Sequence, residues 1–146
     1  MKSTQKVTRV KLNIEENNDY ILLGIVSSEP DYKLSLALNK KFRISLRNRS
    51  SLRVPGVDKS ELTFSRFSNN DDPALPVFYL ISNRSGKNFL LNKLKNIDYL
   101  LQIQNWESEI NINNISSGLK EIESITAFFN IDINTIKDKN LQYLTQ

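Results

Sequence analysis

The distribution of apolar positions along the chain predicts a sheet of about six strands. Residues 7–14 alternate between apolar and polar side chains, and residues 20–27 are apolar on both faces, which is typical of a central strand. The polar turn between these two segments predicts a hairpin. Four more segments have the alternation or the β-branched and aromatic composition of strands: residues 61–68, 77–82, 97–104 and 125–131.

An amphipathic helix is predicted over residues 30–41. Leu34 and Leu38 belong to a stripe of apolar residues at three- and four-residue spacing, so this stripe is expected to lie on the sheet. The preceding sequence has the features of a helix start, with Ser28 as the capping residue, Pro30 in the first turn and an acidic residue three positions after the cap.

A second helix is predicted between the last two strands. Apolar residues recur at helical spacing between Ile115 and Ile122, with Asn114 or Ser116 as the capping residue. Gly118 is expected to weaken this helix by about 1 kcal/mol relative to alanine. Because a helix-containing crossover joins parallel strands, the strands on either side should be parallel neighbours or flank a single strand, with a right-handed connection.

The remaining segments have weaker patterns. Residues 43–56 alternate poorly and end in a Pro-Gly turn pair, which indicates an irregular extended arm that can add a short edge strand. Residues 83–87 are a turn leading into the apolar run 89–91, which extends an antiparallel meander from the two preceding strands. Apolar positions between residues 133 and 144 predict a turn of helix that docks on the sheet or frays.

The predicted elements follow the order β-β-α-β-β-β-α-β. No repeat, low-complexity tract or linker divides them, and 146 residues fit one domain with a single sizeable core. The chain is therefore predicted to be a single α+β domain over residues 1–146, with two main helices packed on a mainly antiparallel sheet.

A distinctive sequence leads into the strand at residues 97–104, and it reads Leu91-Asn92-Lys93-Leu94-Lys95-Asn96-Ile97-Asp98-Tyr99. It resembles the motif of the IPExxxVDY family, whose name spells that motif. The Ile-Asp-Tyr end matches, whereas Asn92 and Lys93 stand where members carry Pro-Glu. The resemblance continues in order over nearly the whole chain, at residues 31–34, 39–40, 64–67, 80–83 and 136–141. It implies no established activity. Family genes often lie beside those of a ribonuclease III and of fatty-acid synthesis, which implies RNA or acyl carrier protein as a partner.

The composition argues against several kinds of chemistry. The chain has no Cys and no His, so thiol nucleophiles, thiolate metal sites and imidazole acid–base catalysis are absent. No catalytic, cofactor-binding or metal-ligating residue is therefore assigned. The sequence shows neither the apolar core of a secretory signal nor an apolar run long enough to span a bilayer, so a cytoplasmic location without a membrane partner is predicted.

Positive charge is concentrated in the first third of the chain. The net charge is +4, and residues 1–56 carry eleven Lys or Arg against five Asp or Glu. The strongest candidate site consists of six cations within fourteen residues: Lys40, Lys41, Arg43, Arg47, Arg49 and Arg53. They are expected to produce local positive potential, and the planar fork of arginine suits phosphate oxygens. The alternative is a solvated basic loop that keeps a sheet edge soluble.

Three weaker candidates have simpler structural interpretations. Phe64 and Phe67 suggest stacking on nucleic-acid bases, although alternating Phe in a strand is more often core. Asp98 is expected to be a structural group that accepts hydrogen bonds from backbone N–H groups or from an arginine such as Arg66. The acidic pair at positions 71 and 72 has a turn composition and lacks the spacing of a calcium loop.

The sequence therefore favours a non-enzymatic binding or adaptor module. Its basic arm is expected to engage RNA or a ribonucleoprotein. The alternative is an adaptor for an acidic protein such as an acyl carrier protein, and the third hypothesis is an enzyme that works with carboxylates alone. The sequence does not define the oligomeric state.

Overall fold

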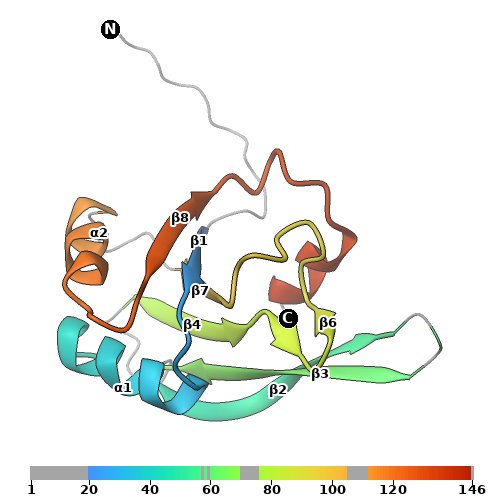
Figure 1. The fold of residues 1–146 in the computed structure, drawn as a ribbon, viewed down its shortest axis with the longest axis horizontal. Coiled ribbons are helices and arrows are strands. Elements are labelled where there is room, and N and C mark those ends of the chain that lie inside the picture. Colours follow the sequence, from blue (N-terminus) through green and yellow to red (C-terminus); the bar gives the residue numbers. More distant parts are fainter. Residues whose placement is uncertain (1–19, 57, 59, 70–75, 105–111, 146) are drawn as a thin grey trace, which may run out of the picture.

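The structure, a computed structural model, describes residues 20–56, 58, 60–69, 76–104 and 112–145. Six strands form one antiparallel sheet in the order β2-β3-β4-β7-β1-β8, which confirms the α+β fold (Figure 1). The main elements are β1 (Tyr20–Val26), α1 (Asp31–Phe42), β2 (Arg47–Pro55), β3 (Glu61–Ser68), β4 (Val77–Ser82), β7 (Tyr99–Gln104), α2 (Ile112–Lys120), β8 (Ala127–Ile131) and the 3-10 helix η2 (Lys139–Thr145).

Both faces of the sheet are covered, by different kinds of structure. Leu34 and Leu38 of α1 pack with residues of α2 on one face. On the other face, Leu91 of the irregular segment before β7 and Leu144 of η2 belong to one core cluster. Figure 1 shows α1 and α2 on the left of the molecule, and η2, in red, in its right half above β2 and β3. The docking of the chain's last apolar residues confirms one of the two outcomes predicted for them.

The central strands are apolar on both faces because each face has a layer to pack against. Leu23 of β1 belongs to the helix-side cluster, and its neighbour Leu22 belongs to the opposite cluster. Gly24 permits a close approach there, because a Cβ at this position would lie only 2.9 Å from Cδ1 of Ile97. Gly24 interrupts the apolar run of β1 because the Ile97 side chain, in the segment before β7, occupies the space that a Cβ would need.

The predicted relation between the strands around α2 is confirmed. β7 and β8 both pair with β1 in antiparallel orientation, so they are parallel to each other with β1 between them. The expected strand at residues 7–14 and its hairpin lie outside the described residues, as does most of the connection after β7. The described strands beside β1 are β7 and β8, which come from the last third of the chain.

Both predicted helices form, but the capping residues predicted for them were wrong. Pro30 is the N-cap residue of α1, with no side-chain capping bond, and Ser28 lies outside the helix. Helix α2 begins at Ile112, so the two capping candidates, Asn114 and Ser116, lie within it. A side chain that accepts a hydrogen bond commonly caps the first turn of a helix. In α1 no side chain does so, and the first hydrogen bonds are those from the N–H groups of Lys33 and Leu34 to the Pro30 carbonyl.

Gly118 is required by the packing of the helices. A Cβ at this position would lie 2.5 Å from Cε1 of Phe42, whose ring stacks on Phe78 with centroids 6.1 Å apart. The close approach of α2 to this ring therefore depends on the missing side chain. Alanine, the better helix former, would overpack this contact, so Gly118 was wrongly interpreted as only a weak point.

Two segments differ from the predicted meander. The arm adds the edge strand that was expected, but this strand, β2, is nine residues long and pairs with β3 on both sides of a register shift. The apolar run after the turn does not join the main sheet. Instead β5 (Arg84–Ser85) and β6 (Asn88–Phe89) form a separate two-stranded hairpin around Gly86, which has the positive φ that favours glycine.

Candidate binding surface on helix α1

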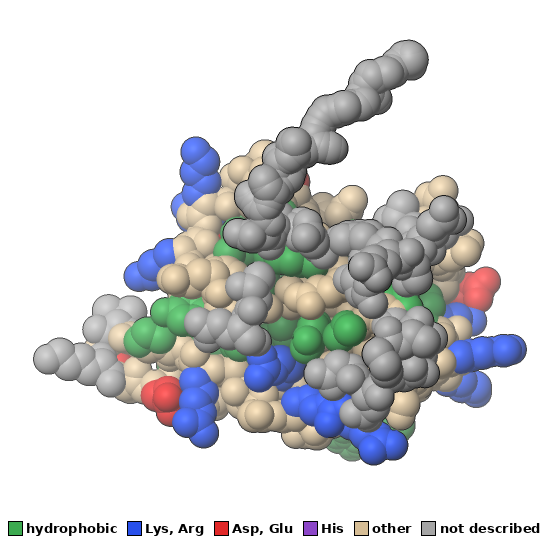
Figure 2. All heavy atoms as spheres, turned by 180° about the vertical axis from the view of Figure 1, so that it is seen from behind, with side chains coloured by type: hydrophobic (Ala, Val, Ile, Leu, Met, Phe, Trp, Pro, Cys, Tyr) green, Lys and Arg blue, Asp and Glu red, His purple; other side chains and the backbone are tan. Residues whose placement is uncertain are grey.

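The structure separates the six predicted cations into two groups. Lys40, Lys41 and Arg43 lie at the C-terminal end of α1 on the helix side of the sheet. The other three lie on β2, where Arg49 pairs with Arg66 of β3 and Arg53 pairs with Thr63. Figure 2 shows Lys and Arg side chains at several separate places on the face it presents.

A β-bulge divides the β2 cations further. Directly paired residues of an antiparallel ladder point to the same face, and the register shifts between Arg49 and Leu52. Arg49 therefore shares a face with Arg66, while Arg53 lies on the opposite face. Without the bulge, residues 47, 49 and 53 would all point the same way. The predicted single basic arm is consequently not one surface, and this part of the site prediction was wrong.

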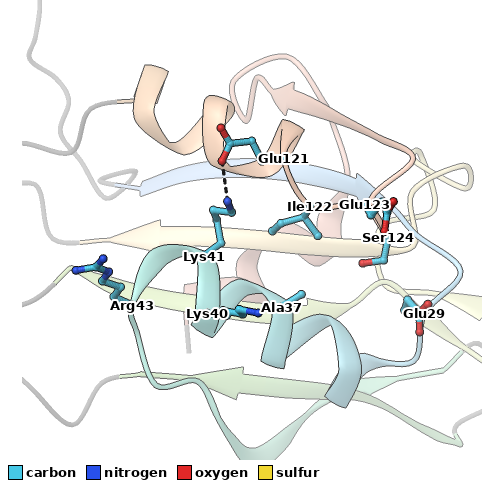
Figure 3. A pocket seen from close by; sticks show the side chains of 9 residues that line it. All are labelled: Glu29, Ala37, Lys40, Lys41, Arg43, Glu121, Ile122, Glu123 and Ser124. Atoms are coloured by element: carbon cyan, nitrogen blue, oxygen red, sulfur yellow. Dashed lines mark hydrogen bonds and ion pairs between the residues drawn. The ribbon is translucent and has the colours of Figure 1, made fainter.

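A groove of about 860 Å³ separates α1 from the turn between α2 and β8. Lys40, Lys41 and Arg43 line it from α1, and Glu121 and Glu123 line it from the opposite side (Figure 3). Lys41 bridges the groove, since its Nζ donates to Glu121 Oε1 at 2.6 Å. This hydrogen bond and the Lys41 charge hold the pKa of the Glu121 carboxyl below its usual value. Lys41 is thus already paired within the protein.

The two ends of the groove have opposite charge. Arg43 stands at one end in Figure 3, and Glu29, Glu123 and Ser124 stand at the other. A phosphate backbone laid along the groove would meet the carboxylates as well as the cations. The groove itself therefore does not have the uniform positive potential of a nucleic-acid channel.

Arg43 adopts a left-handed conformation, with φ 57° and ψ 47°. It directly follows α1, and its backbone N–H donates to the Asn39 carbonyl, as in an αL helix end. Glycine or asparagine is usual at such a position because a Cβ is unfavourable there. An arginine held in this conformation, with its side chain exposed beside the groove, is therefore of functional interest.

The outer surface of α1 carries apolar side chains in water. Tyr32 is 54% exposed and Leu36 is 62% exposed, although both are large and apolar. They lie four residues apart, and Lys40 follows at the same spacing, so the three occupy one stripe of the helix. We define the α1 face as the exposed residues Tyr32, Lys33, Leu36, Lys40 and Arg43. The apolar periodicity of the sequence predicted the buried stripe of this helix and not the exposed apolar part of the α1 face.

Asn83 was also missed, and it organises the segment that contains the family-like motif. Its side chain is fully buried, and its Nδ2 donates to the carbonyl oxygens of Leu94 and Ile97, each at 2.9 Å. Its Oδ1 accepts from the Leu91 N–H at 2.8 Å. Asn140, in the first turn of η2, adds a 2.7 Å bond from its Nδ2 to the Leu90 carbonyl. These bonds satisfy backbone groups of a buried segment that no strand or helix pairs.

Asp98 has the structural role that the sequence predicted, with a different arginine. Its Oδ2 accepts from the Ser27 N–H at 2.9 Å, and its Oδ1 accepts from Arg84 Nε at 2.8 Å. Arg84 also lies over the Phe89 ring, 5.1 Å from its centroid. Arg66, the arginine named in the prediction, donates from Nε to the Ser50 carbonyl instead.

Replacing Asp98 by alanine is expected to destabilise the protein by about 1–2 kcal/mol, because the Ser27 N–H and Arg84 lose their acceptor. The effect stays modest since the Arg84 side chain is 50% exposed and water can replace part of the bond. Urea unfolding followed by circular dichroism measures this change. A matched replacement of the exposed Asp132 should have a smaller effect. Equal stabilities of the wild type and the Asp98 variant would contradict the structural role.

Tyr99, the last residue of the motif, is a neutral donor in the core. Its hydroxyl donates to the Glu29 carbonyl at 2.6 Å, which ties β7 to the segment before α1. Burial raises the pKa of Tyr99 to about 12, with smaller contributions from Asp31, Asp98 and Glu29. The phenol therefore keeps its proton at neutral pH and serves as a structural donor.

The remaining candidates do not form a site in the described part of the chain. Phe64 and Phe67 are both buried, on opposite faces of the sheet, so neither is available for base stacking. The acidic pair at positions 71 and 72 lies outside the described residues. Within the described ranges, no group of three or more acidic side chains is placed to hold a metal ion. None of the described helices is long and apolar enough to cross a membrane.

Comparisons with protein-family models, with curated proteins and with solved structures give no match to this chain.

Proposed function

We propose that this protein is a non-enzymatic binding module whose α1 face holds an acidic, partly apolar segment of a partner protein. The observation that supports this proposal is the exposure of Tyr32 and Leu36 among Lys33, Lys40 and Arg43. A surface that combines large apolar side chains with one sign of charge fits an amphipathic helix that carries acidic residues. An acidic adaptor partner such as an acyl carrier protein has this chemistry.

RNA remains the competing partner, and the α1 face supports it less well. An aliphatic side chain such as Leu36 contributes little to contacts with phosphates, and the groove beside it has acidic residues at one end. An acidic protein helix would use both the apolar and the cationic members of the α1 face. The α1 face also lies apart from Arg47 and Arg49, so a protein partner does not require all six cations to act together.

Two labelled probes test this proposal by fluorescence anisotropy: an amphipathic peptide with Glu on one face and Leu on the other, and single-stranded RNA. Leu36→Ala is expected to weaken peptide binding about tenfold, through the loss of buried apolar area. Reversing Lys40 and Arg43 to Glu should abolish peptide binding. Reversing Arg47 and Arg53 together to Glu, an equal charge change outside the α1 face, serves as the control and should leave peptide binding unchanged.

The two probes separate the hypotheses. RNA binding that is unchanged by Leu36→Ala, and whose affinity falls with salt concentration, would identify RNA as the partner in place of a protein. The expected slope of log affinity against log salt concentration is about −0.7 per phosphate contact. Binding of neither probe by the folded wild-type protein would reject the α1 face as a polyanion or acidic-peptide site. In a lysate, capture of an acidic protein that survives nuclease and is lost in the Leu36 variant would agree with the peptide result.

A further inference from the structure

The two edges of the sheet are protected very differently. Edge strands expose unpaired backbone groups, and proteins block them with charged residues, proline or a bulge. β2, at one edge, has all three: a row of arginines, the bulge after Arg49 and Pro55 at its end. Protection of a sheet edge therefore accounts in part for the arginines of β2. This is the alternative interpretation of the basic segment given above, in which it is not a binding arm.

β8, at the other edge, has none of these features. The segment from Thr126 to Ile131 contains no charged residue and no proline. Its pairing with β1 is regular from Leu22 to Val26, without a register shift. Phe129, at the middle of the strand, is 47% exposed. Among the described residues, no strand pairs with the outer edge of β8.

We propose that β8 pairs with β8 of a second copy of this chain, in antiparallel orientation about a two-fold axis near Phe129. In such an interface the same surface meets itself, so it must be self-complementary. β8 meets this condition, because an uncharged strand opposes no like charges. The same arrangement at β2 would place arginines opposite one another.

The location of Phe129 supports pairing between two copies. Phe129 pairs with Gly24 of β1, so it has no cross-strand side chain to pack against on that side. In an antiparallel pair centred on Phe129, its ring would lie beside the ring of the second copy on the same face of a continuous sheet. Aromatic cross-strand pairs of this kind are among the favourable ones. This interface uses none of the residues of the α1 face.

The first test is the mass of the full chain in solution as a function of concentration. An edge of five residues buries a small area, so a concentration-dependent dimer is expected between about 1 µM and about 500 µM. Phe129→Lys should remain monomeric throughout. Leu36→Lys, which also places a lysine at an exposed apolar site but outside β8, should dimerise like the wild type. A monomeric wild type, or a dimer that persists in Phe129→Lys, would overturn the proposal.

A second test does not depend on how Phe129→Lys folds. The natural chain has no Cys, so Phe129→Cys introduces a single thiol. Directly opposed strand residues have the Cα separation that a disulfide requires, so mild oxidation should produce a covalent dimer rapidly. Leu36→Cys is the matched control for random collision. Equal rates of cross-linking in the two variants would overturn the proposed β8 interface, and loss of dimer in Leu36→Lys alone would assign self-association to the α1 face.

Discussion

Replacing Asn83 by alanine is expected to lower the free energy of unfolding by at least about 3 kcal/mol. The substitution leaves two buried carbonyl groups, of Leu94 and Ile97, and the buried N–H of Leu91 without their side-chain partner. Each such group costs about 1–3 kcal/mol when it cannot reach water. Because small domains are stable by only about 5–15 kcal/mol, the variant loses a large part of its stability.

Urea unfolding followed by far-ultraviolet circular dichroism measures the loss. Asn92→Ala, which removes an exposed amide from the same segment, is the control and should change the stability by less than about 0.5 kcal/mol. Asn83→Asp is a stricter variant of similar shape, because a carboxylate keeps the acceptor for Leu91 but cannot donate to the two carbonyls. If both Asn83 variants unfold like the wild type, the segment before β7 is not held by this side chain.

Replacing Gln102 by methionine is expected to raise the free energy of unfolding by about 1–3 kcal/mol. Gln102 lies in the middle of β7 between Leu22 and Tyr79, and its side chain is fully buried. Neither atom of its amide has a hydrogen-bond partner among the described residues. Methionine has a similar length and no amide to desolvate, and its flexible side chain fits an existing core site.

Gln104, two residues along the same face of β7 and only partly buried, provides the control. Gln104→Met should change the stability by less than about 0.5 kcal/mol, since water still reaches that amide. A melting temperature that falls in the Gln102 variant would mean that this amide is bonded in solution. Thermal unfolding of the two variants beside the wild type gives the comparison directly.

Most strands could be predicted because successive side chains of a strand point to opposite faces of the sheet, which leaves a regular pattern in the sequence. β3 and β4 begin and end where the alternation of residues 61–68 and 77–82 indicates. β1 was predicted as a central strand from an apolar run on both faces. Local periodicity is sufficient in these cases, because the core on each side of the sheet requires it.

Features that depend on a single residue or on a distant contact could not be predicted in the same way. The bulge in β2 occurs between serines and has no signal in the sequence, yet it decides that Arg53 and Arg49 point to opposite faces. Gly118 looks like a weakness of α2 until the Phe42 ring is placed beside it. The sequence could therefore identify the six cations but not that they lie on separate surfaces.

For Asp98, the role of the side chain could be predicted from the sequence but its arginine partner could not. Burial at the start of a core strand implied a paired carboxylate, and this was confirmed. The choice among the chain's arginines required the hairpin of β5 and β6, which brings Arg84 beside Asp98. Asn83 carried no signal at all, because an asparagine in a turn normally faces water.

The position of β1 also affects how the chain acquires its structure during synthesis. β1 is translated before every other described strand, but its two partners, β7 and β8, are translated after residue 98. An emerging chain therefore holds an apolar strand without its two described partners until most of the protein has left the ribosome. Contacts of such large sequence separation slow folding and prolong the exposure of aggregation-prone edges. β1, an interior strand beside one edge of the finished sheet, is thus the segment that a growing chain must keep from aggregating for longest.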